Sequence, residues 1–183
     1  MFQLCHALRC AFLALLACAA PLAEGCCAPS TPPAPEFSDK LSLRCFEAAG
    51  ARYKIDPLLL YAIAQVESRL RSGAVNHNRD GTVDYGVMQI NSSHLPWLKQ
   101  RGIDERRLLE EPCTSVHVGA SILADMMGRL GYTWDAVGAY NAGAAQGRAA
   151  ARSRYAAKVW ERYQPLRRAR SRLGREAAVS SAR

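Results

Sequence analysis

Several features that would identify a metal-dependent or nucleic-acid-binding protein are missing from this sequence of 183 residues. It has no Cys/His spacing typical of a zinc site, no aromatic motif of the RNA-recognition type and no glycine-rich phosphate-binding loop. Its histidines lack the spacing of metal ligands, and the chain has no internal repeats. We therefore predict no metal, no cofactor and no nucleic-acid partner.

The charge of the chain is unevenly placed. The net charge is +8, which is compatible with an anionic partner, but much of it is concentrated in residues 165–183, which contain six arginines and one glutamate. We predict that this basic tail is disordered. Two interpretations stay open: a solvated extension, or a contact with an acidic protein partner or an anionic lipid.

The N-terminal region has the pattern of an export signal. The apolar stretch from Ala11 to Ala23 is too short to span a membrane comfortably and is followed by small residues. We assign residues 1–25 to a signal peptide, residues 26–37 to a proline-rich linker and residues 38–164 to one folded domain. The predicted location is the periplasm. Lipidation at Cys18 is the alternative, and contact with the membrane is expected only in that case.

Two of the seven cysteines, Cys45 and Cys113, lie in the predicted domain. An exported chain reaches an oxidising compartment, which favours a Cys45–Cys113 disulfide. The alternative is a pair of unpaired buried thiols.

The domain is predicted to be α+β and mostly helical. Asp56-Pro57 is a helix start signal, and Asp80-Gly81 is a two-residue turn signal that predicts a short β-hairpin. Apolar residues recur at helical spacing elsewhere. The predicted helices cover residues 39–53, 57–69, 92–102, 112–130, 133–140 and 149–163.

Two carboxylates stand out beside this pattern. Glu67 ends an apolar helix, where loss of solvent raises the pKa of a carboxyl group, and Asp84 follows on the hairpin. One protonated and one ionised carboxyl group is the pair that cleaves glycosidic bonds. The simpler alternatives are a solvated Glu67 paired with Arg71 and an Asp84 satisfied by backbone amides of the hairpin.

The order of short motifs is similar to that in a known family. Glu67-Ser68 and Asp84-Tyr85-Gly86 resemble c-type lysozymes, whereas Ala139-Tyr140-Asn141-Ala142-Gly143 matches the soluble lytic transglycosylases, which also share Gly86-Val87-Met88-Gln89. The remaining matches resemble the small transglycosylases associated with type III secretion: Cys45, Asp56-Pro57, Pro112-Cys113, Gly119-Ala120 and Thr133-Trp134.

The resemblance implies a lysozyme-like fold with a substrate cleft and an enzyme that cleaves peptidoglycan glycan strands. It implies that Glu67 is the acid and base that forms a 1,6-anhydro sugar and that Tyr140 orients it. It also implies sugar-binding or supporting roles for Ser68, Met88, Gln89 and Asn141. Asp84 departs from the transglycosylase pattern and is a second catalytic candidate.

Three functional hypotheses remain. The first is a lytic transglycosylase that opens the wall for a secretion system or pilus, one component of which would be a partner. The others are a lysozyme-like hydrolase and a wall-binding module that does not cleave.

Overall fold

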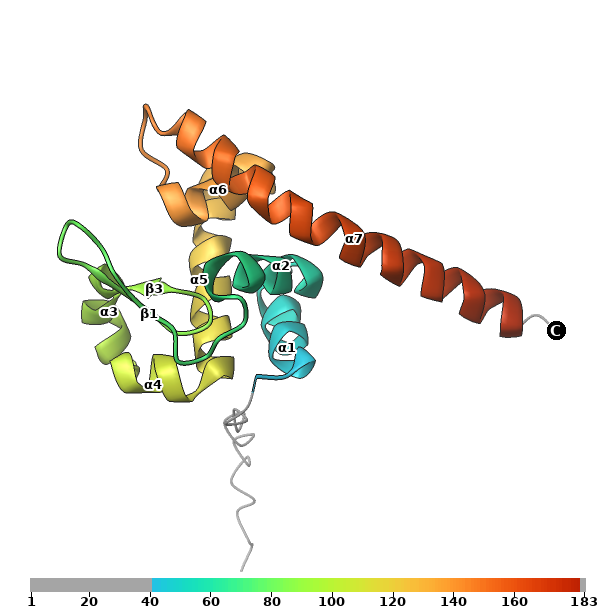
Figure 1. Ribbon diagram of the computed structural model, residues 1–183, viewed down its shortest axis with the longest axis horizontal. Coiled ribbons are helices and arrows are strands. Elements are labelled where there is room, and N and C mark those ends of the chain that lie inside the picture. Colours follow the sequence, from blue (N-terminus) through green and yellow to red (C-terminus); the bar gives the residue numbers. More distant parts are fainter. Residues whose placement is uncertain (1–40, 182–183) are drawn as a thin grey trace, which may run out of the picture. The chain divides into compact units, whose positions relative to one another are not determined.

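The computed structural model describes residues 41–181 (Figure 1). The predicted signal peptide, the linker and Cys18 lie outside the described residues. None of the helices in the described part of the chain is long and apolar enough to cross a membrane.

The described residues form an α+β fold dominated by helices, as the sequence predicts. Three short strands make one antiparallel sheet in the order β1-β2-β3: β1 Val75–His77, β2 Val83–Tyr85 and β3 Ile90–Asn91. The helices are α1 Leu43–Tyr53, α2 Pro57–Ser68, the 3-10 helix η1 Ser92–His94, α3 Leu95–Lys99, α4 Glu105–Glu110, α5 Pro112–Leu130, α6 Trp134–Ala142 and α7 Ala149–Ser181.

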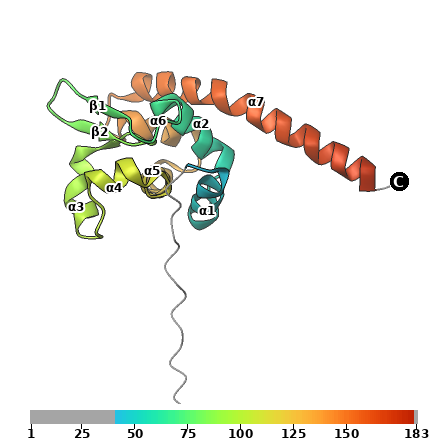
Figure 2. The ribbon, with the colours of Figure 1, turned by 60° about the horizontal axis from the view of Figure 1, so that its bottom comes forward.

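Helix α5 occupies the middle of the arrangement. The sheet, α3 and α4 lie on one side of it, and α1 and α2 lie on the other (Figures 1 and 2). The Cys45–Cys113 disulfide joins α1 to the first turn of α5, with the two Cα atoms 4.9 Å apart, so the predicted pairing is confirmed.

Helix α2 forms where the sequence predicts it because its start and its apolar content agree. The Asp56 side chain accepts a hydrogen bond from the Leu58 amide, and Pro57 occupies the first turn. The following residues are almost all apolar, and Leu60 and Ile63 are fully buried. Burial of this helix places its last turn, which carries Glu67, at the edge of the core.

The predicted hairpin is also present. Asp80 accepts hydrogen bonds from the backbone amide and the hydroxyl of Thr82, and Gly81 takes the positive φ that the turn requires. The register pairs Asn76 with Asp84, and β3 brings Asn91 opposite Asp84. The sheet therefore collects polar side chains around one carboxylate.

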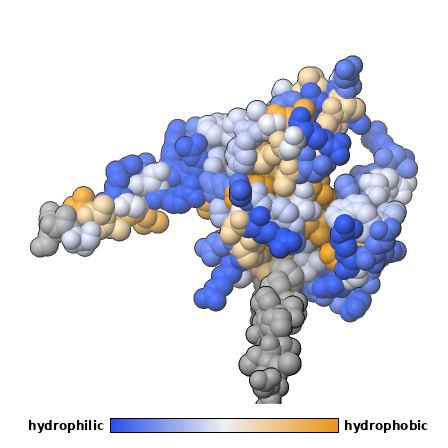
Figure 3. Space-filling model, turned by 180° about the vertical axis from the view of Figure 1, so that it is seen from behind, coloured by the Kyte–Doolittle hydropathy of each residue, from blue (hydrophilic) through white to orange (hydrophobic). Residues whose placement is uncertain are grey.

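The C-terminal segment differs from the prediction. We expected the helix to end at Tyr163 and residues 165–183 to be disordered, but α7 continues to Ser181. Arginine, alanine and leucine have high helix propensity, and Arg170 donates two hydrogen bonds to the Asp56 carboxylate at 2.9 and 2.8 Å. The outer part of α7 is largely hydrophilic over its arginine-rich stretch (Figure 3).

Gly86 holds the turn between β2 and β3 against α4. Its φ is +75°, and a Cβ atom there would lie 2.1 Å from the Leu108 carbonyl oxygen. We expect Gly86→Ala to lower the free energy of unfolding by about 2 kcal/mol or more, because backbone strain and a clash add. Gly81→Ala is the matched control: it has similar φ but nothing within 4 Å, so it should cost about 1 kcal/mol. Equal losses in urea unfolding would show that the contact with Leu108 is unimportant.

Candidate active site

A groove of about 420 Å³ lies where the hairpin faces α6 and the ends of α2 and α5. Glu67 and Asp84 both line it, so the structure brings the two predicted carboxylates to one site. The other lining residues are Asn78, Asp80, Thr82, Gln89, Asn91, His94, Ile122, Met126, Ala139, Tyr140, Asn141 and Gly143.

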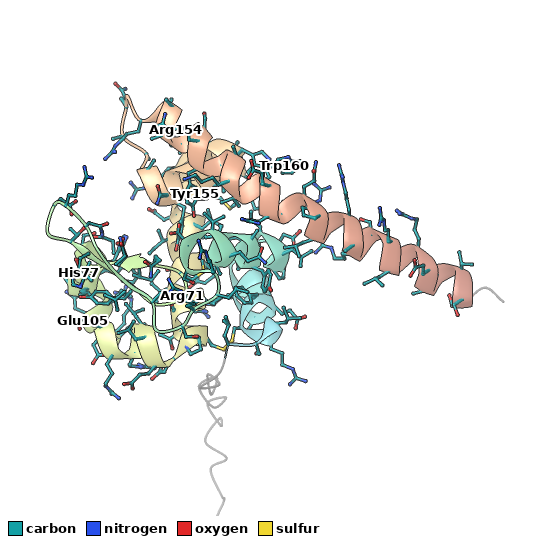
Figure 4. The ribbon with its side chains drawn as sticks, viewed as in Figure 1. Arg71, His77, Glu105, Arg154, Tyr155 and Trp160 are labelled. Carbon is teal, nitrogen blue, oxygen red and sulfur yellow. A yellow bond between two sulfur atoms is a disulfide. The ribbon has the colours of Figure 1, made fainter. Side chains whose placement is uncertain are left out.

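Glu67 is held by a residue that the sequence motifs did not single out. The Tyr155 hydroxyl, on the N-terminal half of α7 (Figure 4), donates a hydrogen bond to Glu67 Oε1. Burial raises the pKa of Tyr155 well above its ordinary value, and the negative charge of Glu67 adds to the effect. Tyr155 therefore remains the donor in this pair.

The surroundings of Glu67 favour its protonated form. Burial raises the pKa of Glu67 from its ordinary value of 4.5 to about 7, and the nearby charge of Asp84 also raises it. The Tyr155 hydrogen bond and the Lys158 ammonium act in the opposite direction. A carboxyl group with a pKa near 7 can both donate and accept a proton at neutral pH. Arg71, the partner in the simpler interpretation, instead donates to the Ser68 carbonyl oxygen at 3.1 Å.

Asp84 sits among asparagine side chains. Its Oδ2 accepts hydrogen bonds from Asn78 Nδ2 at 2.9 Å and Asn76 Nδ2 at 3.3 Å, and its Oδ1 accepts one from Asn91 Nδ2 at 2.8 Å. These donors come from β1, the turn and β3, so the whole sheet fixes the carboxylate. These donors are side-chain amides and not the backbone amides of the simpler interpretation, and Asp84 lines the groove.

Tyr140 has a different partner from the predicted one. Its hydroxyl donates to the Met88 carbonyl oxygen at 2.8 Å, and its ring stacks on Tyr155 with the centroids 6.5 Å apart. These contacts join Tyr140 to the turn that carries Met88 and to the tyrosine that bonds Glu67. Tyr140 lines the groove together with Glu67, so its role in orienting Glu67 stays a prediction.

The four residues with predicted sugar-binding or supporting roles divide into two pairs. Gln89 and Asn141 line the groove, although Gln89 Nε2 is bonded to the Ala74 and Gly86 carbonyl oxygens. Ser68 and Met88 are 2% and 0% exposed and do not line it. The Ser68 hydroxyl donates to the Val87 carbonyl oxygen at 2.8 Å. Both side chains therefore support the turn beneath the groove.

Removing the Tyr155 hydroxyl tests its effect on Glu67. We expect Tyr155→Phe to raise the Glu67 pKa, because the hydrogen bond to the ionised form is lost. The alkaline limb of the kcat/KM profile should then move up by about one pH unit. Tyr163→Phe is the control, because that hydroxyl lies further along α7 and donates to Asp56. A lower rate without a shift of the alkaline limb would indicate that the Tyr155 hydroxyl contributes only to packing.

Comparison with known proteins agrees with this geometry. Residues 44–163 match the family described as Transglycosylase SLT domain. The chain is 55% identical to invasion protein IagB of Salmonella typhimurium over 123 residues, which cover 67% of this chain and 77% of that protein. It is 44% identical over 119 residues to protein IpgF of Shigella flexneri, with 65% and 78% covered.

A third relative is a peptidoglycan-binding-like protein of Escherichia coli O157:H7, 44% identical over 132 residues, with 68% of this chain and 79% of that protein covered. The chain belongs to the transglycosylase SLT family. It is a lytic transglycosylase, an enzyme that acts on peptidoglycan, and the resemblance drawn from its motifs is confirmed.

Proposed function

We propose that Glu67 performs both proton transfers in cleavage of the β-1,4 bond between N-acetylmuramic acid and N-acetylglucosamine. The protonated carboxyl group donates its proton to the glycosidic oxygen as the bond from that oxygen to the anomeric carbon breaks. The Glu67 carboxylate then accepts the proton of the muramyl 6-hydroxyl, and that oxygen bonds to the anomeric carbon. Glu67 ends protonated, no water is consumed, and a 1,6-anhydro sugar forms.

We propose an electrostatic role for Asp84 in this reaction. The two Asp84 oxygens accept three amide hydrogen bonds from three asparagines, which hold the carboxylate in a fixed position on the wall of the groove. A fixed negative charge facing the groove stabilises the oxocarbenium-like transition state without bonding to it. Among the groove residues, Gln89 and Asn141 supply the predicted contacts to sugar hydroxyl or acetamido groups.

The observation that carries the proposal is that Glu67, held by the Tyr155 hydroxyl, and Asp84 line the same groove; the burial that raises the Glu67 pKa to about 7 agrees with it. The test is digestion of purified peptidoglycan in ¹⁸O-labelled water, followed by mass spectrometry of the new ends. We expect anhydro ends without ¹⁸O. Reducing ends that contain ¹⁸O would identify a lysozyme-like hydrolase, and no cleavage would favour a wall-binding module.

The biological setting is a further part of the proposal. The export pattern of residues 1–25 and a peptidoglycan substrate support a periplasmic location. The name of the Salmonella relative, an invasion protein, supports local opening of the wall for a secretion system, whose components would be partners. In a deletion strain, secretion should be restored by the wild-type chain and not by Glu67→Gln. Equal rescue by both would contradict a role for wall cleavage.

A further inference from the structure

A second groove borders the catalytic groove. This second groove, of about 680 Å³, crosses α5 between the end of α1 and helix α3. His94, Ile122 and Met126 line both grooves, so the two share a wall. We call it the arginine groove. Its other lining residues are Arg52, Tyr53, Trp97, Leu98, Arg101, Ile103, His117, Val118, Ser121, Asp125 and Arg129.

The two grooves carry opposite charge. The catalytic groove contains Asp80 and Asp84 beside Glu67. The arginine groove contains three arginines and one aspartate, and Arg129 forms an ion pair with that aspartate, Asp125, at 2.9 Å.

The histidines do not add to the positive charge of the arginine groove near neutral pH. Burial lowers the pKa of His94, and burial together with the charge of Arg52 lowers that of His117. The positive charge of this groove therefore comes from its arginines.

Aromatic rings support two of these arginines. The Arg101 guanidinium lies 5.1 Å from the centre of the Trp97 ring and donates to the Trp97 carbonyl oxygen at 3.0 Å. The Arg52 guanidinium lies 5.8 Å from the centre of the Tyr53 ring. A guanidinium that is held over a ring keeps its hydrogen-bonding edge available for a carboxylate.

We propose that the arginine groove binds the acidic stem peptide of the peptidoglycan strand whose sugars occupy the catalytic groove. This proposal rests on the proposed function. The stem peptide is attached to the muramyl lactyl group and carries free carboxylates, which arginine binds through paired hydrogen bonds. Neutral sugars offer no charge that complements Arg52 and Arg101. The apolar lining residues Ile103 and Val118 suit the methyl and methylene groups of short peptide side chains.

The test compares two substrates: glycan strands with intact stem peptides, and the same strands after removal of the peptides by an amidase. We expect the wild-type protein to prefer peptide-bearing strands. In Arg52→Ala/Arg101→Ala the ratio of the two kcat/KM values should fall about tenfold, because charged hydrogen bonds to the peptide are lost. The control is Arg44→Ala, an exposed arginine of α1 outside the groove, which should keep the wild-type ratio.

Two outcomes would overturn the proposal. One is an equal loss on both substrates, which would make the groove a sugar subsite. The other is an unchanged ratio in a double variant that unfolds like the wild-type protein. If the wild-type protein cleaves neither substrate, the proposed function fails. Calorimetric measurement of the binding of the two strand types then decides whether the arginine groove binds the stem peptide. Tighter binding of peptide-bearing strands by the wild-type protein, lost in the double variant, would support peptide binding in the arginine groove. Equal binding of the two strand types by the wild-type protein would refute it.

Discussion

Replacing Glu67 with glutamine is expected to lower kcat by about 10²–10⁴-fold, the contribution typical of a positioned acid or base. The loss should fall at the upper end, because the same carboxyl group acts in both proton transfers. Glutamine keeps the size of the side chain and an oxygen that can accept the Tyr155 hydrogen bond. The rate is measured by stopping the digestion of peptidoglycan at set times and quantifying the released fragments by chromatography.

The same substitution should make the protein more stable at alkaline pH. The unfolded chain releases the Glu67 proton near pH 4.5, whereas the folded chain holds it until about pH 7. The stability of the wild-type protein therefore falls as pH rises through this window, by up to about 3 kcal/mol, and glutamine avoids the loss. Below pH 4.5 the two proteins should be equally stable.

The control for this prediction is Glu161→Gln, which removes a carboxylate from an exposed position of α7. It should change neither the rate nor the pH dependence of unfolding. If the Glu67→Gln protein is inactive but gains no stability above pH 7, Glu67 is catalytic but burial does not raise its pKa. Full activity in Glu67→Gln would remove this residue from the mechanism.

Replacing Asp84 with asparagine is expected to lower kcat by about 10²-fold, a loss typical for removal of one preorganised electrostatic group. The variant should still make anhydro ends, because Glu67 remains. Its free energy of unfolding should also fall by about 1 kcal/mol. The reason is that three asparagine amides point at this side chain, and asparagine offers one acceptor oxygen where aspartate offers two.

Asp80→Asn provides the comparison, since Asp80 lines the same groove but bonds only within its own turn. The loss of kcat in Asp80→Asn should be clearly smaller than the loss in Asp84→Asn. Equal losses in the two variants would show that general negative charge in the groove matters more than the fixed position of Asp84. An unchanged kcat in Asp84→Asn would refute the electrostatic role.

The parts of the fold that local chemistry determines were predictable. The capped, apolar stretch at Pro57 became α2, and the Asp80-Gly81 turn became a hairpin. The range predicted for α5, 112–130, agrees with the structure. Helix α4 was missed: it is short, and its Asp104 cap, which accepts from the Arg107 amide, lies in a charged stretch without an apolar stripe.

The site was predictable in its residues and less so in their contacts. Motif order identified Glu67, Asp84, Gln89 and Asn141, all of which line the groove. No local pattern shows which tyrosine reaches Glu67, because that depends on how α7 packs against α2 and α6. The arginine groove was missed for the same reason, since α1, α3 and α5 contribute to it from distant parts of the chain.

The central claim is that burial keeps Glu67 protonated near neutral pH. A direct measurement is titration of the side-chain carboxyl carbons by NMR in the ¹³C-labelled full chain, with Glu67→Gln used to assign the signal. The account predicts one glutamate that titrates at about pH 7 and moves to higher pH in Tyr155→Phe. A Glu67 signal that titrates near its ordinary value of 4.5 would contradict the account.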